Sequence, residues 1–135
     1  MATINFAGSI KRAMGDPEFS REMRFFTGCV KLAVDNEETV AKFADGKLES
    51  ADAHTGGSMA VVFTDLVDDD CKIVIRGSHD IWDRLLEPYP IPFYQCLQTC
   101  NVKHGLFISA TNETFAYLPA LNRLVALLRA ERNGG

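Results

Sequence analysis

The stretch that decides the fold runs from Lys72 to Leu86 and reads KIVIRGSHDIWDRLL. Its opening residues include three consecutive β-branched side chains, which is typical of a buried strand. Gly77 closes that run, and Ser78 is a residue type that caps helices because its hydroxyl accepts a hydrogen bond from the first turn. The pattern predicts a strand over Lys72–Arg76 and, directly after it, a helix to about Leu86.

Upstream of this stretch the apolar residues recur with a period of two. Val30–Asp35 alternates in this way, which predicts a strand with one buried and one wetter face. Asn36-Glu37-Glu38 predicts a turn. Thr39–Ala44 and Lys47–Ala53 predict two more strands, joined at Asp45-Gly46, because this dipeptide suits a tight hairpin. Together the segments predict an antiparallel meander.

Helix signals precede the strands. Asp16 can cap a helix, and Pro17 fits its first position, where the missing N–H would be unpaired in any case. This helix is predicted to run to about Met23. A short amphipathic helix is predicted before it from apolar residues at near-helical spacing: Ile4, Ala7, Ile10 and Met14.

Prolines at every second position keep Pro88–Pro92 extended. A helix is predicted next, over Phe93–Val102, and then a strand over Leu106–Ala110. Met59–Leu66 is apolar and fits either a strand or a buried helix.

A last helix is predicted from Asn112 or Thr114 to about Arg132. Pro119 lies either in its first turn or at a kink. The helix carries one broad apolar stripe, formed by Leu118, Leu121, Leu124, Val125 and Leu128. The order of helix, strands, helices, strand and helix predicts an α+β fold. With 135 residues and no internal repeat or linker, the chain is predicted to form a single domain over 1–135.

Composition narrows the classes of partner. The net charge of -4 argues against nucleic acid or an anionic membrane as partner, because both are bound through an excess of Lys and Arg. No run approaches the roughly 20 apolar residues that span a bilayer, and the first residues do not resemble a secretory signal. We expect a cytoplasmic protein without stable membrane insertion.

The cysteines are expected to be reduced thiols in the core; they are Cys29, Cys71, Cys96 and Cys100. Cys96, Cys100 and His104 are spaced four apart and would share one face of a helix, as soft-metal ligands do. However, a fourth ligand is missing nearby and Gly105 would stop the helix. No metal is therefore predicted.

No catalytic motif is found. The phosphate-binding and dinucleotide-binding loops, the nucleophile elbow and the zinc-protease histidine pair are all absent. Arg76–His79 could hold an anion at a helix start, but a capped helix is the simpler interpretation. His54, His79 and His104 are candidate general bases. His79 and its neighbour Asp80 do not face each other on a helix and so do not form a dyad, and a surface or hydrogen-bonded role is the simpler interpretation for each histidine. We predict neither a cofactor nor catalytic residues.

Large apolar side chains come from several separate segments of the chain. Such a set either packs into a solid core or lines a cavity, and periodicity does not distinguish the two. A family resemblance favours the cavity. Lys72–Leu86 and the proline-rich Glu87–Phe93 resemble the sterol carrier protein type-two domain family, in which a strand ending in glycine leads into a helix with a tryptophan and paired leucines. Here these are Gly77, Trp82, and Leu85 with Leu86.

Later segments are similar in the same order. Gly105–Ile108 is similar to the late strand of that family and Leu121–Arg129 to its closing helix, so the resemblance covers about residues 18–129. Ser109–Asn112 departs from the pattern, because relatives often carry Gly-Asp before the last helix.

The resemblance implies a twisted, mainly antiparallel five-stranded sheet covered by helices, with an apolar tunnel between sheet and helices. It implies binding, and transfer or presentation inside the cell, of a fatty acid, a fatty acyl-CoA or a sterol. The residues predicted to contact this ligand are Phe26, Trp82, Leu85, Leu86, Phe93, Leu97, Phe107, Leu118, Leu121, Leu124, Val125 and Leu128.

Two other functions stay open. A small cofactor-free enzyme of the ketosteroid-isomerase or cyclase type would also enclose an apolar pocket, and would need a buried carboxylate base with a raised pKa, for which Asp52 and Asp65 are the candidates. An accessory module for a partner enzyme would instead expose an apolar patch.

Overall fold

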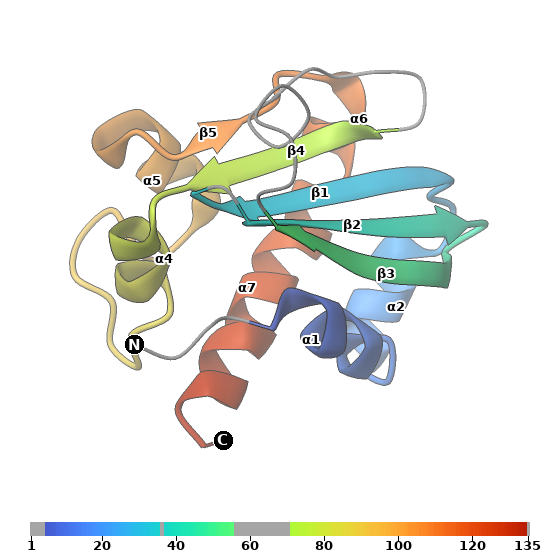
Figure 1. The fold of residues 1–135 in the computed structure, drawn as a ribbon, viewed down its shortest axis with the longest axis horizontal. Helices are drawn as coiled ribbons and strands as arrows, with labels where there is room; N and C mark the ends of the chain where they lie inside the picture. Colours follow the sequence, from blue (N-terminus) through green and yellow to red (C-terminus); the bar gives the residue numbers. More distant parts are fainter. Residues whose placement is uncertain (1–4, 36, 56–70, 135) are drawn as a thin grey trace.

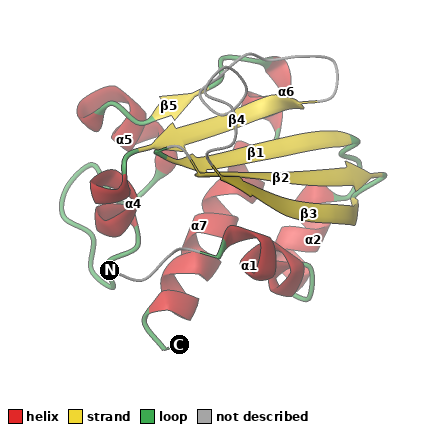
Figure 2. Cartoon of the chain, in the orientation of Figure 1, coloured by secondary structure: helices red, strands yellow, loops and turns green. Residues whose placement is uncertain are grey.

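The computed structural model of the chain describes residues 5–35, 37–55 and 71–134. Its strands form one five-stranded sheet in the order β3-β2-β1-β4-β5 (Figures 1 and 2). The strands are β1 (Gly28–Val34), β2 (Glu37–Ala44), β3 (Lys47–Thr55), β4 (Cys71–Gly77) and β5 (Phe107–Ile108). The described helices are α1 (Phe6–Ala13), α2 (Pro17–Met23), α4 (His79–Leu85), α5 (Leu97–His104), α6 (Asn112–Ala116) and α7 (Leu118–Arg132).

The architecture is α+β, as predicted, and the sheet is mostly antiparallel. β1 pairs with β2, β2 with β3, and β4 with β5 in antiparallel fashion. The pair of β1 and β4 is parallel, so the sheet is mixed. Helices α1, α2 and α7 lie on one face of the sheet, while α4 and α5 lie at the end where β4 finishes (Figure 1).

The side-chain caps of α2 and α4 and the hairpin between β2 and β3 form as predicted. The Asp16 side chain accepts a hydrogen bond from the Phe19 N–H (2.9 Å) at the start of α2, and the Ser78 hydroxyl accepts one from Ile81 (3.2 Å) at the start of α4. Gly46 has φ +78° in the turn between β2 and β3. A Cβ there would also lie 2.4 Å from the Arg24 backbone, so glycine is required twice over.

The prediction of a wetter face on β1 is wrong. Lys31 and Ala33 are buried, like the residues that alternate with them. β1 lies between β2 and β4, so side chains of both neighbouring strands, such as Val40 and Val74 opposite Lys31, flank them on the same face. The Lys31 ammonium lies 3.9 Å from a carboxylate oxygen of Glu38, which compensates part of its burial. Glu38 lies in β2 and not in a turn; Asp35, at φ +52°, begins the turn before it.

The segments after the prolines also differ from the prediction. α5 begins at Leu97 rather than Phe93, because Phe93 has φ +74°, which no helical residue adopts. The predicted strand over Leu106–Ala110 shortens to two residues. The single last helix is in fact two, with Tyr117 between α6 and α7, and Pro119 lies in the first turn of α7.

The core lies between the sheet and the helices. Trp82 has no exposed surface, its indole N–H donates to the Ala33 carbonyl of β1 (2.9 Å), and its ring packs edge-on against Phe6 of α1. Within the described ranges, no helix combines the length and apolar character needed to cross a membrane. Met59–Leu66 and Asp65 lie outside the described residues.

Candidate functional site

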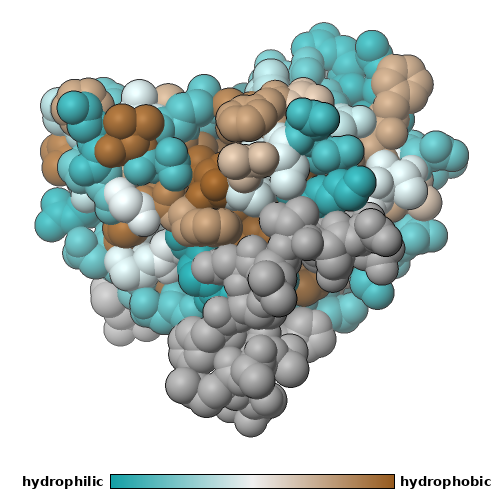
Figure 3. Space-filling view, turned by 90° about the horizontal axis from the view of Figure 1, so that it is seen from above, coloured by the Kyte–Doolittle hydropathy of each residue, from teal (hydrophilic) through white to brown (hydrophobic). Residues whose placement is uncertain are grey.

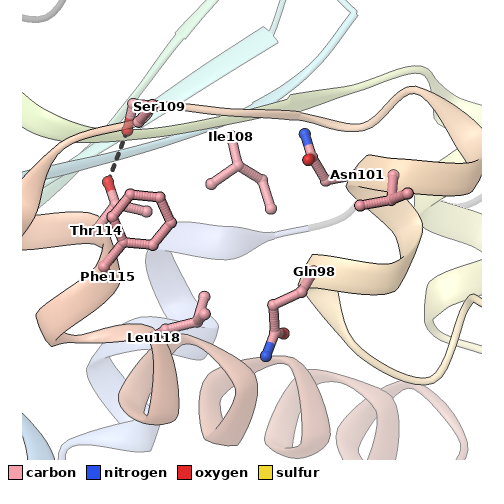
Figure 4. Close-up of a pocket in the computed structure, with 9 residues that line it drawn as sticks. Gln98, Asn101, Ile108, Ser109, Thr114, Phe115 and Leu118 are labelled. Atoms are coloured by element: carbon pink, nitrogen blue, oxygen red, sulfur yellow. Dashed lines mark hydrogen bonds between the residues drawn. The ribbon is translucent and has the colours of Figure 1, made fainter.

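A pocket of 260 Å³ opens where α5, β5, α6 and the start of α7 meet (Figure 4). Each of these elements contributes to the wall, and so does the short link between β5 and α6. The lining residues are Gln98, Asn101, Val102, Ile108, Ser109, Ala110, Thr114, Phe115 and Leu118.

The α5 wall comes from residues at helical spacing. Gln98, Asn101 and Val102 share one face because positions three and four apart are neighbours on a helix, whereas Leu97 and Cys100 are fully buried in the core. The Asn101 amide donates to the Leu106 carbonyl (2.7 Å) and so holds the end of α5 to the start of β5.

A side chain of α7 fixes the other end of α5. Cys96 provides no side-chain cap, and instead the Asn122 Oδ1 accepts from the Leu97 N–H (3.0 Å). The amide nitrogen of Asn122 donates to the Gln98 Oε1 (2.8 Å). One residue of the long helix therefore sets both the start of α5 and the orientation of a pocket side chain.

Hydroxyl groups build the wall opposite α5. Ser109 Oγ accepts from the Val74 N–H (2.9 Å) and lies 2.8 Å from the Thr114 Oγ1. Thr111 caps α6 through the Thr114 N–H and donates to the Lys72 carbonyl (2.7 Å). These side-chain hydrogen bonds hold the segment after β5 to β4, beyond the point where the pairing of the two strands ends. Because the hydroxyls are used within the protein, this wall offers the pocket chiefly carbon surface.

The rest of the pocket is apolar and continues onto the surface. Ile108, Phe115 and Leu118 point toward its interior from three elements (Figure 4). Val102 is 75% exposed and Phe115 64% exposed, and the nearby Phe107 is 38% exposed. Apolar side chains gather on this face of the molecule (Figure 3). Exposed apolar groups around a hollow are typical of a ligand-binding or interaction site.

Most side chains predicted to contact ligand lie elsewhere. Nine of them are at most 4% exposed and belong to one cluster of packed side chains: Phe26, Trp82, Leu85, Leu86, Leu97, Leu121, Leu124, Val125 and Leu128. Leu118 lines the pocket, whereas Phe93 and Phe107 are at the surface. The predicted tunnel is not among the features that the described residues show.

The sequence interpretation missed eight of the nine described lining residues. The available signal was weak: Val102 stands between Asn101 and Lys103, and Phe115 follows polar residues on a short segment. Each is an apolar side chain in polar surroundings, which is normal for a single surface residue.

The candidate histidines and the anion site do not line the pocket. His79 Nδ1 lies 3.1 Å from Asp83 on α4, and its backbone N–H donates to Asp35, so protein groups already occupy that helix start. A Cβ at Gly77 would lie 2.8 Å from the Leu106 side chain, which explains the glycine without a phosphate. The side chain of His54 is outside the described set.

The third histidine belongs to a small aromatic group. His104 stacks on Tyr94 with centroids 3.9 Å apart, and its buried Nε2 has no hydrogen-bond partner among the described residues. Burial raises the pKa of the Cys100 thiol to about 11. In the part of the chain that the structure describes, no three His, Cys, Asp or Glu side chains come together as metal ligands would. Cys29, Cys96 and Cys100 are free thiols.

An ion pair anchors α7, which supports the pocket from below. The Arg123 guanidinium donates two hydrogen bonds to the Asp16 carboxylate, at 2.9 and 3.0 Å. These bonds and the bond from the Phe19 N–H lower the pKa of Asp16 to about 2. The N-cap of α2 is thereby joined to the helix that contributes Leu118 to the pocket.

Comparison with known proteins gives a structural match alone. A scan against models of known protein families finds no match, and a search of curated proteins also finds none. The crystal structure of sterol carrier protein 2 superposes with a TM-score of 0.67 and 18% identity, over 94% of this chain and 95% of that one. The solution structure of a conserved hypothetical protein from Thermus thermophilus, a candidate sterol carrier protein, gives a TM-score of 0.64 and 18% identity, over 96% of this chain and 89% of that one.

The sequence-based resemblance is thus confirmed at the level of structure, across nearly the whole of all three chains. The chain has the fold of sterol carrier protein 2.

Proposed function

We propose that this chain binds an apolar, lipid-like ligand in the pocket between α5, β5, α6 and α7, and carries or presents it. The observation that carries the proposal is the composition of the pocket wall. Val102, Ile108, Phe115 and Leu118 provide apolar surface around a hollow of 260 Å³. Burial of ligand surface there would contribute roughly 25 cal/mol per Å².

The structural likeness supports the same class of function. The protein with the TM-score of 0.67 is by name a sterol carrier. The candidates for the ligand here are a sterol, a fatty acid or a fatty acyl-CoA, as the sequence resemblance implies. The cytoplasmic location and a partner enzyme stay predictions.

The proposal assigns the chain no catalytic step. A cofactor-free isomerase or cyclase would need a carboxylate or histidine facing its substrate. Of the candidates, Asp52 is exposed on β3, and His79 faces Asp83 on α4. Neither belongs to the lining of the pocket.

Two measurements test the proposal. Native mass spectrometry of protein purified from cells is expected to show co-purified lipid that is lost after delipidation. The delipidated protein is then expected to bind a fluorescent fatty-acyl probe or a fluorescent sterol saturably, with one site per chain. The proposal is wrong if neither probe binds saturably.

A further inference from the structure

Nine described residues line the pocket, and none of them is charged. The charged groups on the flanking elements are engaged elsewhere. Lys72 of β4 pairs with Glu113 of α6 (3.9 Å), and Arg123 of α7 pairs with Asp16. The Lys103 ammonium of α5 lies over the Phe93 ring, 5.3 Å from its centroid. A negatively charged head group would therefore find no cation among the described residues of the pocket wall.

The polar groups that remain for a ligand are two neutral amides. The Asn101 nitrogen is used toward Leu106 and the Gln98 oxygen toward Asn122. Among the described residues, Gln98 Nε2 is left as a donor and Asn101 Oδ1 is left as an acceptor. Both side chains line the pocket from α5 (Figure 4). A hydroxyl group can accept a hydrogen bond from Gln98 Nε2 or donate one to Asn101 Oδ1. An ionised carboxylate can only accept, so it can pair with Gln98 Nε2 alone.

Size adds a second restriction. The volume of 260 Å³ lies below the range of about 300–1,000 Å³ that is usual for pockets of drug-sized ligands. A single slender chain fits such a space better than a fused ring system. Moving a carboxylate from water to the pocket would also remove hydration that no cation replaces.

Resting on the proposed function, but in place of the three ligands that the resemblance implies, we propose that the pocket takes a single-chain lipid with an uncharged hydroxyl head, such as a long-chain alcohol or a monoacylglycerol. Its chain lies against Ile108, Phe115 and Leu118. Its hydroxyl lies at the rim of the pocket that α5 forms, beside Gln98 and Asn101.

A matched ligand pair tests this. The delipidated protein is titrated with 1-decanol and with decanoate at pH 8, below the solubility limit of decanol and the micellar concentration of decanoate, and the amide signals of α5 and β5 are followed by NMR. We expect decanol to bind at least tenfold more tightly than decanoate. Equal affinities would overturn the head-group inference and leave lipid binding intact. If neither ligand binds, and the fluorescent probes also fail, the proposed function falls as well.

A charge introduced at the rim sharpens the test. Gln98→Lys places a cation where the head group is expected, so the affinity for decanoate should rise at least fivefold without a matching rise for decanol. Gln95→Lys is the control, because Gln95 is exposed and outside the pocket lining; it should leave the ratio of the two affinities unchanged. If Gln98→Lys also leaves that ratio unchanged, the head group does not lie at this rim and the inference fails.

Discussion

The core beneath the sheet and the pocket at its edge are both built from apolar side chains, yet they differ in how completely these are covered. In the core, α7 extends over 15 residues, and Trp82, Leu85 and Leu97 have no exposed surface. At the edge, α6 has five residues and β5 has two, and Val102 and Phe115 remain largely exposed.

The difference teaches that position against the sheet, and not element length, decides what an apolar side chain does here. Trp82 and Leu85 lie on the seven-residue α4 and are nevertheless fully covered, because they face the core. At the edge of the sheet, side-chain hydroxyls and amides such as those of Ser109 and Asn101 hold the elements together, and apolar side chains are left facing a hollow. We expect substitutions in the core to change stability first, and substitutions at the pocket to change ligand affinity first.

The largest effect is expected for Trp82→Ala in the core. Loss of a fully buried tryptophan should lower the free energy of unfolding by about 3–5 kcal/mol, measured by denaturant titration. Under conditions where the variant stays folded, its affinity for the fluorescent probe should be close to that of wild type. A variant of nearly normal stability that no longer binds the probe would place the ligand in the core. If Trp82→Ala does not fold, Leu124→Ala serves the same comparison.

A smaller loss of stability is expected for Thr114→Val in the pocket wall. This side chain is fully buried, and its hydroxyl lies within hydrogen-bond distance of Ser109 and Thr111. Removing it keeps the volume but breaks the hydroxyl cluster, at a cost of about 1–3 kcal/mol. Thermal and denaturant unfolding measure the change. No loss of stability would mean that the cluster does not hold α6 to β4.

Ala110→Trp should affect binding and leave stability nearly unchanged. Ala110 is exposed and lines the pocket, so an indole there would fill the hollow. Probe affinity should fall at least tenfold, while the free energy of unfolding stays within about 0.5 kcal/mol, as is usual for surface positions. Ala130→Trp is the matched control, because Ala130 is exposed near the end of α7 and does not line the pocket. Equal binding by the two variants would contradict the assignment of the site.

The smallest effect is expected from pH. The pKa of Asp16 is about 2 in the folded protein, against an ordinary value of 3.8. Its pairing with Arg123 thus stabilises the fold fully above about pH 4, and this contribution is lost as the pH falls through 2. Asp16→Asn should lower stability at pH 7 and reduce the dependence on pH between 4 and 2, as followed by denaturant unfolding. An unchanged dependence would contradict the role of this pair.

Features with local chemistry could be predicted from the sequence. The cap at Asp16, the hairpin at Asp45-Gly46 and the strand-to-helix junction at Gly77-Ser78 each depend on a few adjacent residues, and the structure confirms all three. The parallel pair of β1 and β4 depends on strands far apart in the chain. The start of α5 depends on Asn122, 25 residues after Leu97. Neither leaves a local pattern.

The pocket could not be predicted for the same reason. It exists because the side chains of α5, β5, α6 and the start of α7 leave a space between them, and the apolar pattern alone does not distinguish filled from empty space. The prediction that followed from the family resemblance placed the ligand among Trp82, Leu85 and the stripe of α7, with Leu118 as the one predicted residue that also lines the pocket.

The most direct test uses a spin-labelled 1-decanol and amide NMR signals of the delipidated protein. Paramagnetic broadening reports which residues lie near the bound chain. We expect the strongest broadening at Asn101, Val102 and Ile108, with little effect at Leu85 and Leu124. Strongest broadening at Leu85 and Leu124, with the pocket signals unaffected, would contradict this expectation and place the ligand beneath the sheet.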